Sequence, residues 1–330
     1  MLLKKIDRDI SKDEWNALIS NYKSKTIYHT YEWLEFIEES QGLKKAIYEI
    51  IMDNEVKGYL VGFRIKKGPI NIFGSPFPGW TTPYMGPLIN DDVSQRIFFE
   101  EFRNLMKREG YHYAELSNSQ LDIELARSQN FIIETGITYI SEIKSTPEEI
   151  LSSYSKSARK CVNRAMRNNV VVETTTDNRF VDYYYTLLEQ VFSKSNMKPT
   201  YSKERVKLLV NKLLPENKII LTWVRKEDRV IACRIDMIDG LWMNSFGSSS
   251  DKDFLKLNPN ELARFHAMCI AAKRGVKYYD MTGGGTYKRK FGAEKTTTYR
   301  IIYSRFGLYC ARNLAKHLIK FRNKIMKAIE

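Results

Sequence analysis

The residues best suited to chemistry lie between Tyr279 and Gly292, where an apolar stretch leads into three glycines and then into cations and aromatics. The glycines at 283–285 allow positive φ angles and a close approach of the backbone to a ligand. The cations at 288–290 offer positive charge to a phosphate or to an oxyanion that develops during a reaction. Tyr287 and Phe291 flank these cations, and two aromatics are costly in a loop that only faces water. The pattern favours a functional loop over a solvated basic loop.

Positive charge is concentrated in two segments of the chain. The sequence has 53 Lys and Arg against 39 Asp and Glu, a formal net charge of +14. Residues 271–330 hold fifteen basic residues and three acids, and residues 156–167 hold five basic residues and no acid. Because a focused positive field attracts phosphate and nucleic acid, we expect a polyanionic partner.

Strands and helices alternate along the chain and must position the loop. Asp53-Asn54 and Glu227-Asp228 are turn pairs flanked by apolar runs, and each predicts a hairpin. Strands are expected at 45–52, 56–65, 111–116, 218–225, 229–238, 241–247 and 276–281, and helices at 92–109, 147–168, 179–194, 203–213, 260–274 and 308–328. The last helix places Leu314, Leu318, Phe321, Ile325 and Ile329 on one apolar stripe.

A short motif occurs twice, each time where a helix leads into a strand. Residues 110–116 and 275–281 both read Gly-x-x-Tyr-x-acid-aliphatic, at an offset of 165 residues. The two hairpin turns lie at nearly the same offset, which indicates a duplicated α/β unit. The order of elements in each unit is that of an N-acyltransferase (GNAT) domain. We therefore expect a mixed α/β (α+β) chain of two tandem GNAT-like domains.

Several common enzymatic motifs are absent from the sequence. It has no Walker A sequence, no G-x-G-x-x-G after a strand and no H-E-x-x-H. The nearest match to a GNAT pyrophosphate loop is Arg289–Glu294, which fails at its last position. The four cysteines form no C-x-x-C pair, and the four histidines have no ligand spacing, so no metal site is expected. No apolar run approaches the roughly 18 residues of a membrane-spanning helix, so we expect a soluble cytosolic protein.

The loop resembles the closing motif of the Fem family (FemABX) of non-ribosomal aminoacyl transferases. In that family an aromatic-Lys pair follows an acidic strand end and a glycine-rich loop, and Tyr287-Lys288 matches this pair. Residues 28–33 resemble the family's N-terminal helix start, 154–165 its basic helix and 242–249 its strand ending in Gly-Ser. The chain length is similar to that of small members without a coiled-coil arm.

The resemblance implies a fold and an activity. A first GNAT-like domain would comprise 1–145 with a returning helix at 305–330, and a second would comprise 146–304. Members move an amino acid from aminoacyl-tRNA to an amine of a peptidoglycan precursor. The implied partners are thus aminoacyl-tRNA as donor and a nucleotide- or lipid-linked envelope precursor as acceptor. No cofactor is expected, and we expect a monomer, with the inner membrane surface as an optional peripheral contact.

The resemblance also implies the site residues. Lys288 would stabilise the oxyanion of the attacked ester, beside Tyr287, and Asp280 would order the loop. Substrate contacts are expected from Trp33, Lys198, Tyr201, Trp242, Phe246, Asp280, Gly284, Lys290 and Phe291. Contacts to tRNA phosphates are expected from Lys156, Arg159, Lys160, Arg164 and Arg289. Peptidoglycan-specific small members carry a lysine just after the N-terminal Trp, where this chain has 34–37 Leu-Glu-Phe-Ile, so another envelope substrate stays open.

Two other functions remain open at this stage. The same fold could use acyl-CoA as donor and acylate an amino sugar of a surface polysaccharide. A non-catalytic nucleic-acid-binding protein would also explain the basic segments, although it does not explain an aromatic-Lys pair behind a glycine loop. The C-terminal helix either packs on the first domain or lies on anionic membrane.

Overall fold

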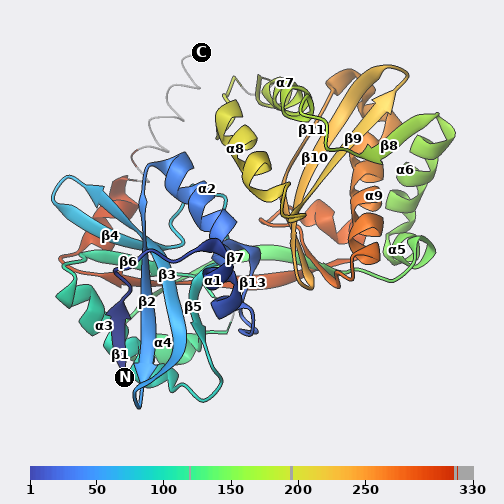
Figure 1. The fold of residues 1–330 in the computed structure, drawn as a ribbon. Helices are drawn as coiled ribbons and strands as arrows, with labels where there is room; N and C mark the ends of the chain where they lie inside the picture. The colour runs from blue at the N-terminus through green and yellow to red at the C-terminus, as the bar shows by residue number, and fades with distance from the viewer. Residues whose placement is uncertain (119, 194–195, 316–317, 319–330) are drawn as a thin grey trace. The chain divides into compact units, whose positions relative to one another are not determined.

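The computed structural model describes residues 1–118, 120–193, 196–315 and 318, and its chain divides into two compact units (Figure 1). Unit 1 comprises residues 1–29, 41–135 and 299–330, and unit 2 comprises 30–40 and 136–298. The division differs from the expected boundaries at three places, because residues 30–40 and 136–145 fall in unit 2 and residues 299–304 fall in unit 1. Ion pairs from Glu32 to Lys218 (2.6 Å) and from Glu35 to Lys212 (2.8 Å) hold residues 30–40 in unit 2.

Unit 1 is a mixed sheet with helices. Its elements are β1 (Leu2–Lys5), α1 (Lys12–Ile19), the short 3₁₀ helix η1 (Ile27–His29), β2 (Lys44–Met52), β3 (Glu55–Lys67), β4 (Ile70–Ser75), β5 (Gly86–Ile89), α3 (Gln95–Arg108), β6 (Tyr113–Leu116) and α4 (Ile123–Ser128). The strand order is β1-β2-β3-β4-β6-β13, and β5 pairs with β3. The pairing of β4 with β6 is parallel, and the other strand pairings described within this unit are antiparallel.

Unit 2 has the same kind of sheet. Its elements are α2 (Tyr31–Gln41), α5 (Pro147–Ser153), α6 (Lys156–Arg167), β8 (Val170–Thr174), α7 (Phe180–Ser193), α8 (Lys203–Leu213), β9 (Ile219–Lys226), β10 (Arg229–Asp239), β11 (Trp242–Ser250), the 3₁₀ helix η2 (Lys252–Leu257), α9 (Pro259–Lys273), β12 (Tyr278–Asp280) and the 3₁₀ helix η3 (Thr286–Phe291). The last residue of α2, Gln41, is assigned to unit 1. The strands β7 (Ile132–Glu142) and β13 (Ala293–Ser304) have residues in both units. The strand order is β7-β12-β11-β10-β9-β8. Helices α5, α6 and α9 cover one face of this sheet, and α7 and α8 lie on the other (Figure 1).

Both predicted hairpins are confirmed at their turns. Asp53, Asn54 and Glu227 have positive φ angles of 53°, 63° and 54°, the left-handed backbone that tight hairpin turns require. The predicted helix at 147–168 is wrong in one respect, because the chain forms two helices there. Tyr154 is extended (ψ 151°), and the Ser155 side chain caps α6 by accepting a hydrogen bond from the Ala158 N–H.

The repeated motif has the same structure in both units. Gly110 and Gly275 follow α3 and α9 with φ angles of 68° and 79°. The N–H of the next residue then bonds back to the last helical turn, from Tyr111 to Met106 (2.8 Å) and from Val276 to Ala271 (3.1 Å). This is a Schellman-type helix end, which needs a left-handed residue that glycine supplies without strain. Each unit therefore turns from a helix into a strand that pairs in parallel with an earlier one.

The C-terminal helix is described only at its start. Residues 308–315 are helical, and Arg312 forms ion pairs with Glu115 and Glu134 (both 3.0 Å), which hold this start in unit 1. Two members of the predicted apolar stripe, Leu314 and Leu318, are 63% and 59% exposed. These two side chains are therefore largely exposed to solvent, and the rest of the stripe lies outside the described residues.

Candidate active site

The parallel pairing of two strands in unit 2 stops where the shorter strand ends. Strands β11 and β12 pair in register from Trp242–Tyr278 to Asn244–Asp280. Strand β12 ends at Asp280, whereas β11 continues to Ser250. The pairing of β11 with β10 skips Phe246, which forms a β-bulge beside Ser245. Ligand sites commonly lie at the carboxyl ends of parallel strands and next to bulges, so this edge is where a site is expected.

Asp280 holds the glycine loop to the strand end. Its Oδ1 accepts hydrogen bonds from the Thr282 N–H (2.7 Å) and from the Thr138 hydroxyl. The Thr282 hydroxyl donates to the carbonyl of Ser245 at 3.1 Å, which ties the loop to the bulged strand. A Cβ at Gly285 would lie 2.7 Å from the Tyr287 ring, so the ring sits where only a glycine leaves room. The loop is thereby fixed on both sides.

Lys288 is buried beneath the same loop. Its side chain is 7% exposed, and its Nζ donates to the carbonyls of Thr282 and Gly283, the latter at 2.8 Å. Burial and the nearby Arg264 hold the pKa of Lys288 below its usual range. An ammonium group has three donors, so one N–H remains beyond these two carbonyls. Tyr287 lies next to it, 56% exposed, with its ring centroid 5.9 Å from the Lys288 Nζ.

A buried network of charges lies below the loop. Arg234 binds Asp236 through two hydrogen bonds of 2.6 and 2.7 Å. The Tyr279 hydroxyl donates to Asp236 at 2.8 Å and accepts from Arg234 and, at 3.3 Å, from Arg264. Burial raises the pKa of Asp236 against the opposing effect of both arginines. Arg234, Asp236 and Arg264 were not among the residues predicted from the sequence, although two charges at i and i+2 within the otherwise apolar stretch 230–238 are a recognisable signal.

A cavity of about 400 Å³ lies at the start of α9. Its lining includes Leu255, Asn258, Glu261, Arg264, Tyr287, Lys290 and Phe291. Lys290 forms an ion pair with Glu261 at 2.8 Å, and its Nζ lies 5.0 Å from the Phe291 ring centroid. Tyr287 is the member of the aromatic-Lys pair that lines this cavity.

The structure brings most predicted loop residues together. Asp280, Gly284, Tyr287, Lys288 and Lys290 share the loop or η3, and Gly284 is exposed. Phe291 belongs to the same segment but is 2% exposed, so it acts mainly as a core residue.

Other predicted substrate contacts lie outside the loop. Tyr201 bonds to the Tyr184 hydroxyl (2.7 Å), and its ring packs on Phe246 (5.3 Å between centroids) at the bulge. Trp242 packs on Tyr278 where the two strands begin, at the end of the pairing away from the loop. Trp33 is fully buried, with its ring 5.0 Å from that of Phe36. Lys198 is exposed in the connection between α7 and α8.

The basic helix α6 begins beside η3. The Ser155 N–H donates to the Lys290 carbonyl at 2.8 Å. Lys156, Lys160 and Arg164 are exposed, and so is Arg289 on η3. Arg159 is half-buried and donates to the carbonyls of Ser152 (3.0 Å) and Tyr154 (2.9 Å). The two predicted phosphate-binding segments thus meet at one place in unit 2.

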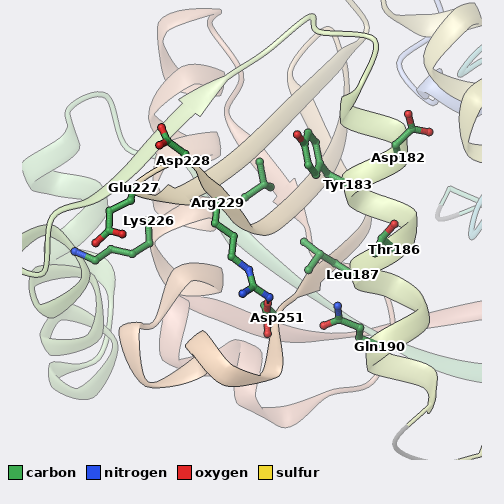
Figure 2. Close-up of a pocket in the computed structure, with 11 residues that line it drawn as sticks. Asp182, Tyr183, Thr186, Leu187, Gln190, Lys226, Glu227, Asp228, Arg229 and Asp251 are labelled. Atoms are coloured by element: carbon green, nitrogen blue, oxygen red, sulfur yellow. The ribbon is translucent and has the colours of Figure 1, made fainter.

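A larger cavity of about 670 Å³ lies between α7 and the β9–β10 turn (Figure 2). Arg229 reaches across it to Asp251, at 2.6 Å. Its charged lining residues are Asp182, Lys226, Glu227, Asp228, Arg229 and Asp251, four acids against two bases. This net negative charge disfavours a polyanionic ligand, so the cavity at α9 is the better candidate for the expected partner.

Comparisons with known proteins agree with this fold. Residues 152–290 match the family model described as an acetyltransferase (GNAT) domain. The crystal structure of FemX superposes with a TM-score of 0.73 at 13% identity, covering 90% of this chain and 96% of that one. The structure of L-PGS from Bacillus licheniformis gives 0.59 at 13% identity, covering 96% and 99%. The C-terminal domain (DUF2156) of a protein from Agrobacterium fabrum, ascribed to lysylphosphatidylglycerol synthetase, gives 0.51 at 11% identity, covering 74% and 81%. No curated protein sequence matches the chain.

These findings define the class of protein. The expected fold of two tandem GNAT-like units is confirmed, and the similarity to the Fem family predicted from the sequence is confirmed for the fold. The domain match also confirms the expectation of a transferase. Among the described residues, no helix has the length and hydropathy to cross a membrane, and no three His, Cys, Asp or Glu are grouped as metal ligands.

Proposed function

We propose that the protein transfers an amino acid from aminoacyl-tRNA to an amine of a cell-envelope precursor. The observation that carries the proposal is the meeting of the basic helix α6 with η3, through the bond from Ser155 to Lys290. This arrangement puts exposed cations beside the loop that holds Lys288, which suits a donor with a phosphate backbone and a reactive ester at its end. The fold shared with FemX and L-PGS supports the same class of reaction.

The start of α9 argues against acyl-CoA as the donor. In GNAT enzymes that use acyl-CoA, free N–H groups at a helix start commonly bind the pyrophosphate. Here that turn contains Pro259, which has no N–H, and Glu261, whose carboxylate disfavours the two negative charges of a pyrophosphate. The segment Arg289–Glu294 lies in η3 and the start of β13, not at the start of an α-helix.

The reaction would follow from the loop geometry. The acceptor amine attacks the ester carbonyl, the C–N bond forms, and the bond to the ribose oxygen breaks. The remaining N–H of Lys288 donates to the oxyanion of the tetrahedral intermediate. Asp280 already accepts from Thr282 and Thr138, so it holds the loop, and the proton of the amine passes to the departing ribose oxygen.

The test is a competition between donors. The full chain is incubated with mixed aminoacyl-tRNAs, acyl-CoA thioesters and amine-bearing precursors that are nucleotide-linked or lipid-linked, and the products are read by mass spectrometry. We expect an acceptor whose mass rises by one amino-acid residue and a product that disappears after ribonuclease treatment. Ribonuclease-insensitive consumption of acyl-CoA would favour the alternative, an N-acyltransferase acting on an amino sugar, which the acetyltransferase-domain match supports. Salt-sensitive RNA binding without any product would contradict both.

A lipid-linked acceptor would bring the protein to the inner membrane surface. The exposed Leu314 and Leu318 at the start of the basic C-terminal segment are compatible with that contact. Sedimentation with anionic liposomes, with and without residues 310–330, tests it. Equal sedimentation of both forms would contradict a role for this segment.

A further inference from the structure

Arg264 is a buried cation at the wall of the cavity in unit 2. It lies on α9, 6% exposed, and its guanidinium carbon is 4.5 Å from the ring centroid of Phe291. The side chain lines the cavity of about 400 Å³ together with Tyr287 and Lys290. Arginine is rarely buried without a partner of opposite charge, so its partner must be identified.

The protein accepts few hydrogen bonds from the donors of this guanidinium. Of its five N–H donors, the described part of the chain shows one hydrogen bond, from Nη1 to the Tyr279 hydroxyl at 3.3 Å. Its Nε is buried, and no described residue accepts a hydrogen bond from it. Asp236, the nearest carboxylate in the network, is already bound by Arg234 through both oxygens. Burial and the charge of Arg234 lower the pKa of Arg264 to about 10.

The charges around the cavity do not cancel. Lys290 and Glu261 form a pair at 2.8 Å, which leaves the charge of Arg264 in excess. The cavity also lies at the N-terminus of α9, where the helix dipole adds partial positive charge. A buried charge without a counter-charge is costly, and a ligand that brings one negative charge would remove this cost.

We propose that this cavity binds a singly charged oxyanion of a substrate, a carboxylate or a phosphodiester, through the guanidinium of Arg264. Its Nη1 bonds to Tyr279, and its Nη2 makes no hydrogen bond to a described residue and is the donor left for an oxygen of such a group. Glu261 disfavours a second negative charge, and Tyr287 and Phe291 supply apolar walls for the rest of the ligand. The inference rests on the proposed function at one point, the identity of the molecule that carries the oxyanion. A carboxylate would belong to the acceptor, and a phosphodiester would belong to the donor.

The test observes Arg264 itself and contains no transfer step. The full chain is labelled with ¹⁵N-arginine, and the Nε–H signal of Arg264 is assigned by its loss in Arg264→Lys. Three probes are titrated: N-acetylalanine, its uncharged methylamide, and the methyl phosphodiester of adenosine 5′-phosphate. We expect at least one of the two anions to shift the Arg264 signal in a saturable way, and the methylamide to leave it unchanged.

Variants provide the second measurement. Arg264→Gln should weaken binding of that anion roughly 10- to 100-fold, the usual effect of losing hydrogen bonds between charged groups. Arg229→Gln, the same change in the other cavity, should leave the affinity unchanged. Saturable binding of N-acetylalanine identifies a carboxylate ligand, and binding of the phosphodiester identifies a donor phosphate. The proposal is overturned if neither anion shifts the signal, or if the methylamide binds as well as the anion. The shifts are measured in wild type and need only the conservative Arg264→Lys for their assignment, so the result stands even if Arg264→Gln is unstable. A positive result without aminoacyl transfer would contradict the proposed function alone.

Discussion

Replacing Lys288 by methionine separates its two contributions, to the reaction and to the loop. Methionine has a similar length and no donor, so it removes the N–H available to an oxyanion. Loss of one such donor typically lowers the rate by about 10²–10³, which corresponds to roughly 2.7–4 kcal/mol. We therefore expect Lys288→Met to lower kcat for transfer by two to three orders of magnitude with little change in KM, because the interaction exists only in the transition state.

The effect of this change on stability should be small, because two terms oppose each other. The carbonyls of Thr282 and Gly283 lose hydrogen bonds from a charged group, each worth about 1.5–3 kcal/mol. The variant also removes a buried charge whose lowered pKa shows that burial opposes it, a relief of several kcal/mol. We expect the free energy of unfolding to change by no more than about 2 kcal/mol.

Single-turnover transfer and urea unfolding measure the two quantities on the same preparation. Lys295→Met, an exposed lysine seven residues further on, is the matched control and should behave as wild type. Turnover of Lys288→Met within about threefold of wild type, with unfolding unchanged, would refute the role of Lys288. If the loss in kcat/KM, expressed as a free energy, equalled the loss in the free energy of unfolding, Lys288 would instead only hold the loop.

Three further predictions concern charge. Asp236→Asn leaves Arg234 buried without its carboxylate and should lower the free energy of unfolding, measured by urea titration, by about 3–5 kcal/mol. An unchanged urea midpoint would show that the ion pair is not needed for stability. Transfer should fall with rising pH at a midpoint below pH 10.5, because burial lowers the pKa of Lys288 and favours its neutral amine. Between the lowered pKa and 10.5 the unfolded chain binds more protons than the native one, so the contribution of Lys288 to stability rises with pH. A midpoint at or above pH 10.5 in the pH profile of transfer would contradict the assignment. Glutamine at three exposed cations of α6 (Lys156, Lys160 and Arg164) should reduce the slope of log affinity for tRNA against log salt concentration by about two to three. The matched triple variant in unit 1, with glutamine at the exposed Lys66, Arg96 and Lys107, should leave this slope unchanged. An equal effect of both triple variants would count against α6 as the tRNA site.

Local signals in the sequence predicted the parts of the fold that local chemistry decides. Turn pairs such as Asp53-Asn54 determine a backbone with positive φ, and Gly110 and Gly275 end their helices in the same way. The split between α5 and α6 was missed although Ser155 is a good N-cap, because the apolar period continues across it. The buried state of Arg264 was beyond prediction, because a single arginine on an amphipathic helix normally faces water. Only the packing of Phe291 and Tyr279 around it encloses its charge.

The repeated strand end explains why the candidate site belongs to unit 2. In unit 1 the motif places Glu115 at the end of β6, where Arg300 (3.1 Å) and Arg312 (3.0 Å) form ion pairs with it and the Tyr113 hydroxyl donates to it at 2.9 Å. Arginine side chains therefore neutralise the carboxylate, and the strand end is closed. In unit 2 the equivalent Asp280 accepts from a backbone N–H of the glycine loop that bonds to Lys288. The same acidic position thus stabilises packing in one unit and holds a loop in the other. A positive φ at Gly283 and the open space at Gly284, where the nearest atom to an added Cβ would be 4.0 Å away, are what the second unit has at this point, and they allow a ligand to approach the backbone there.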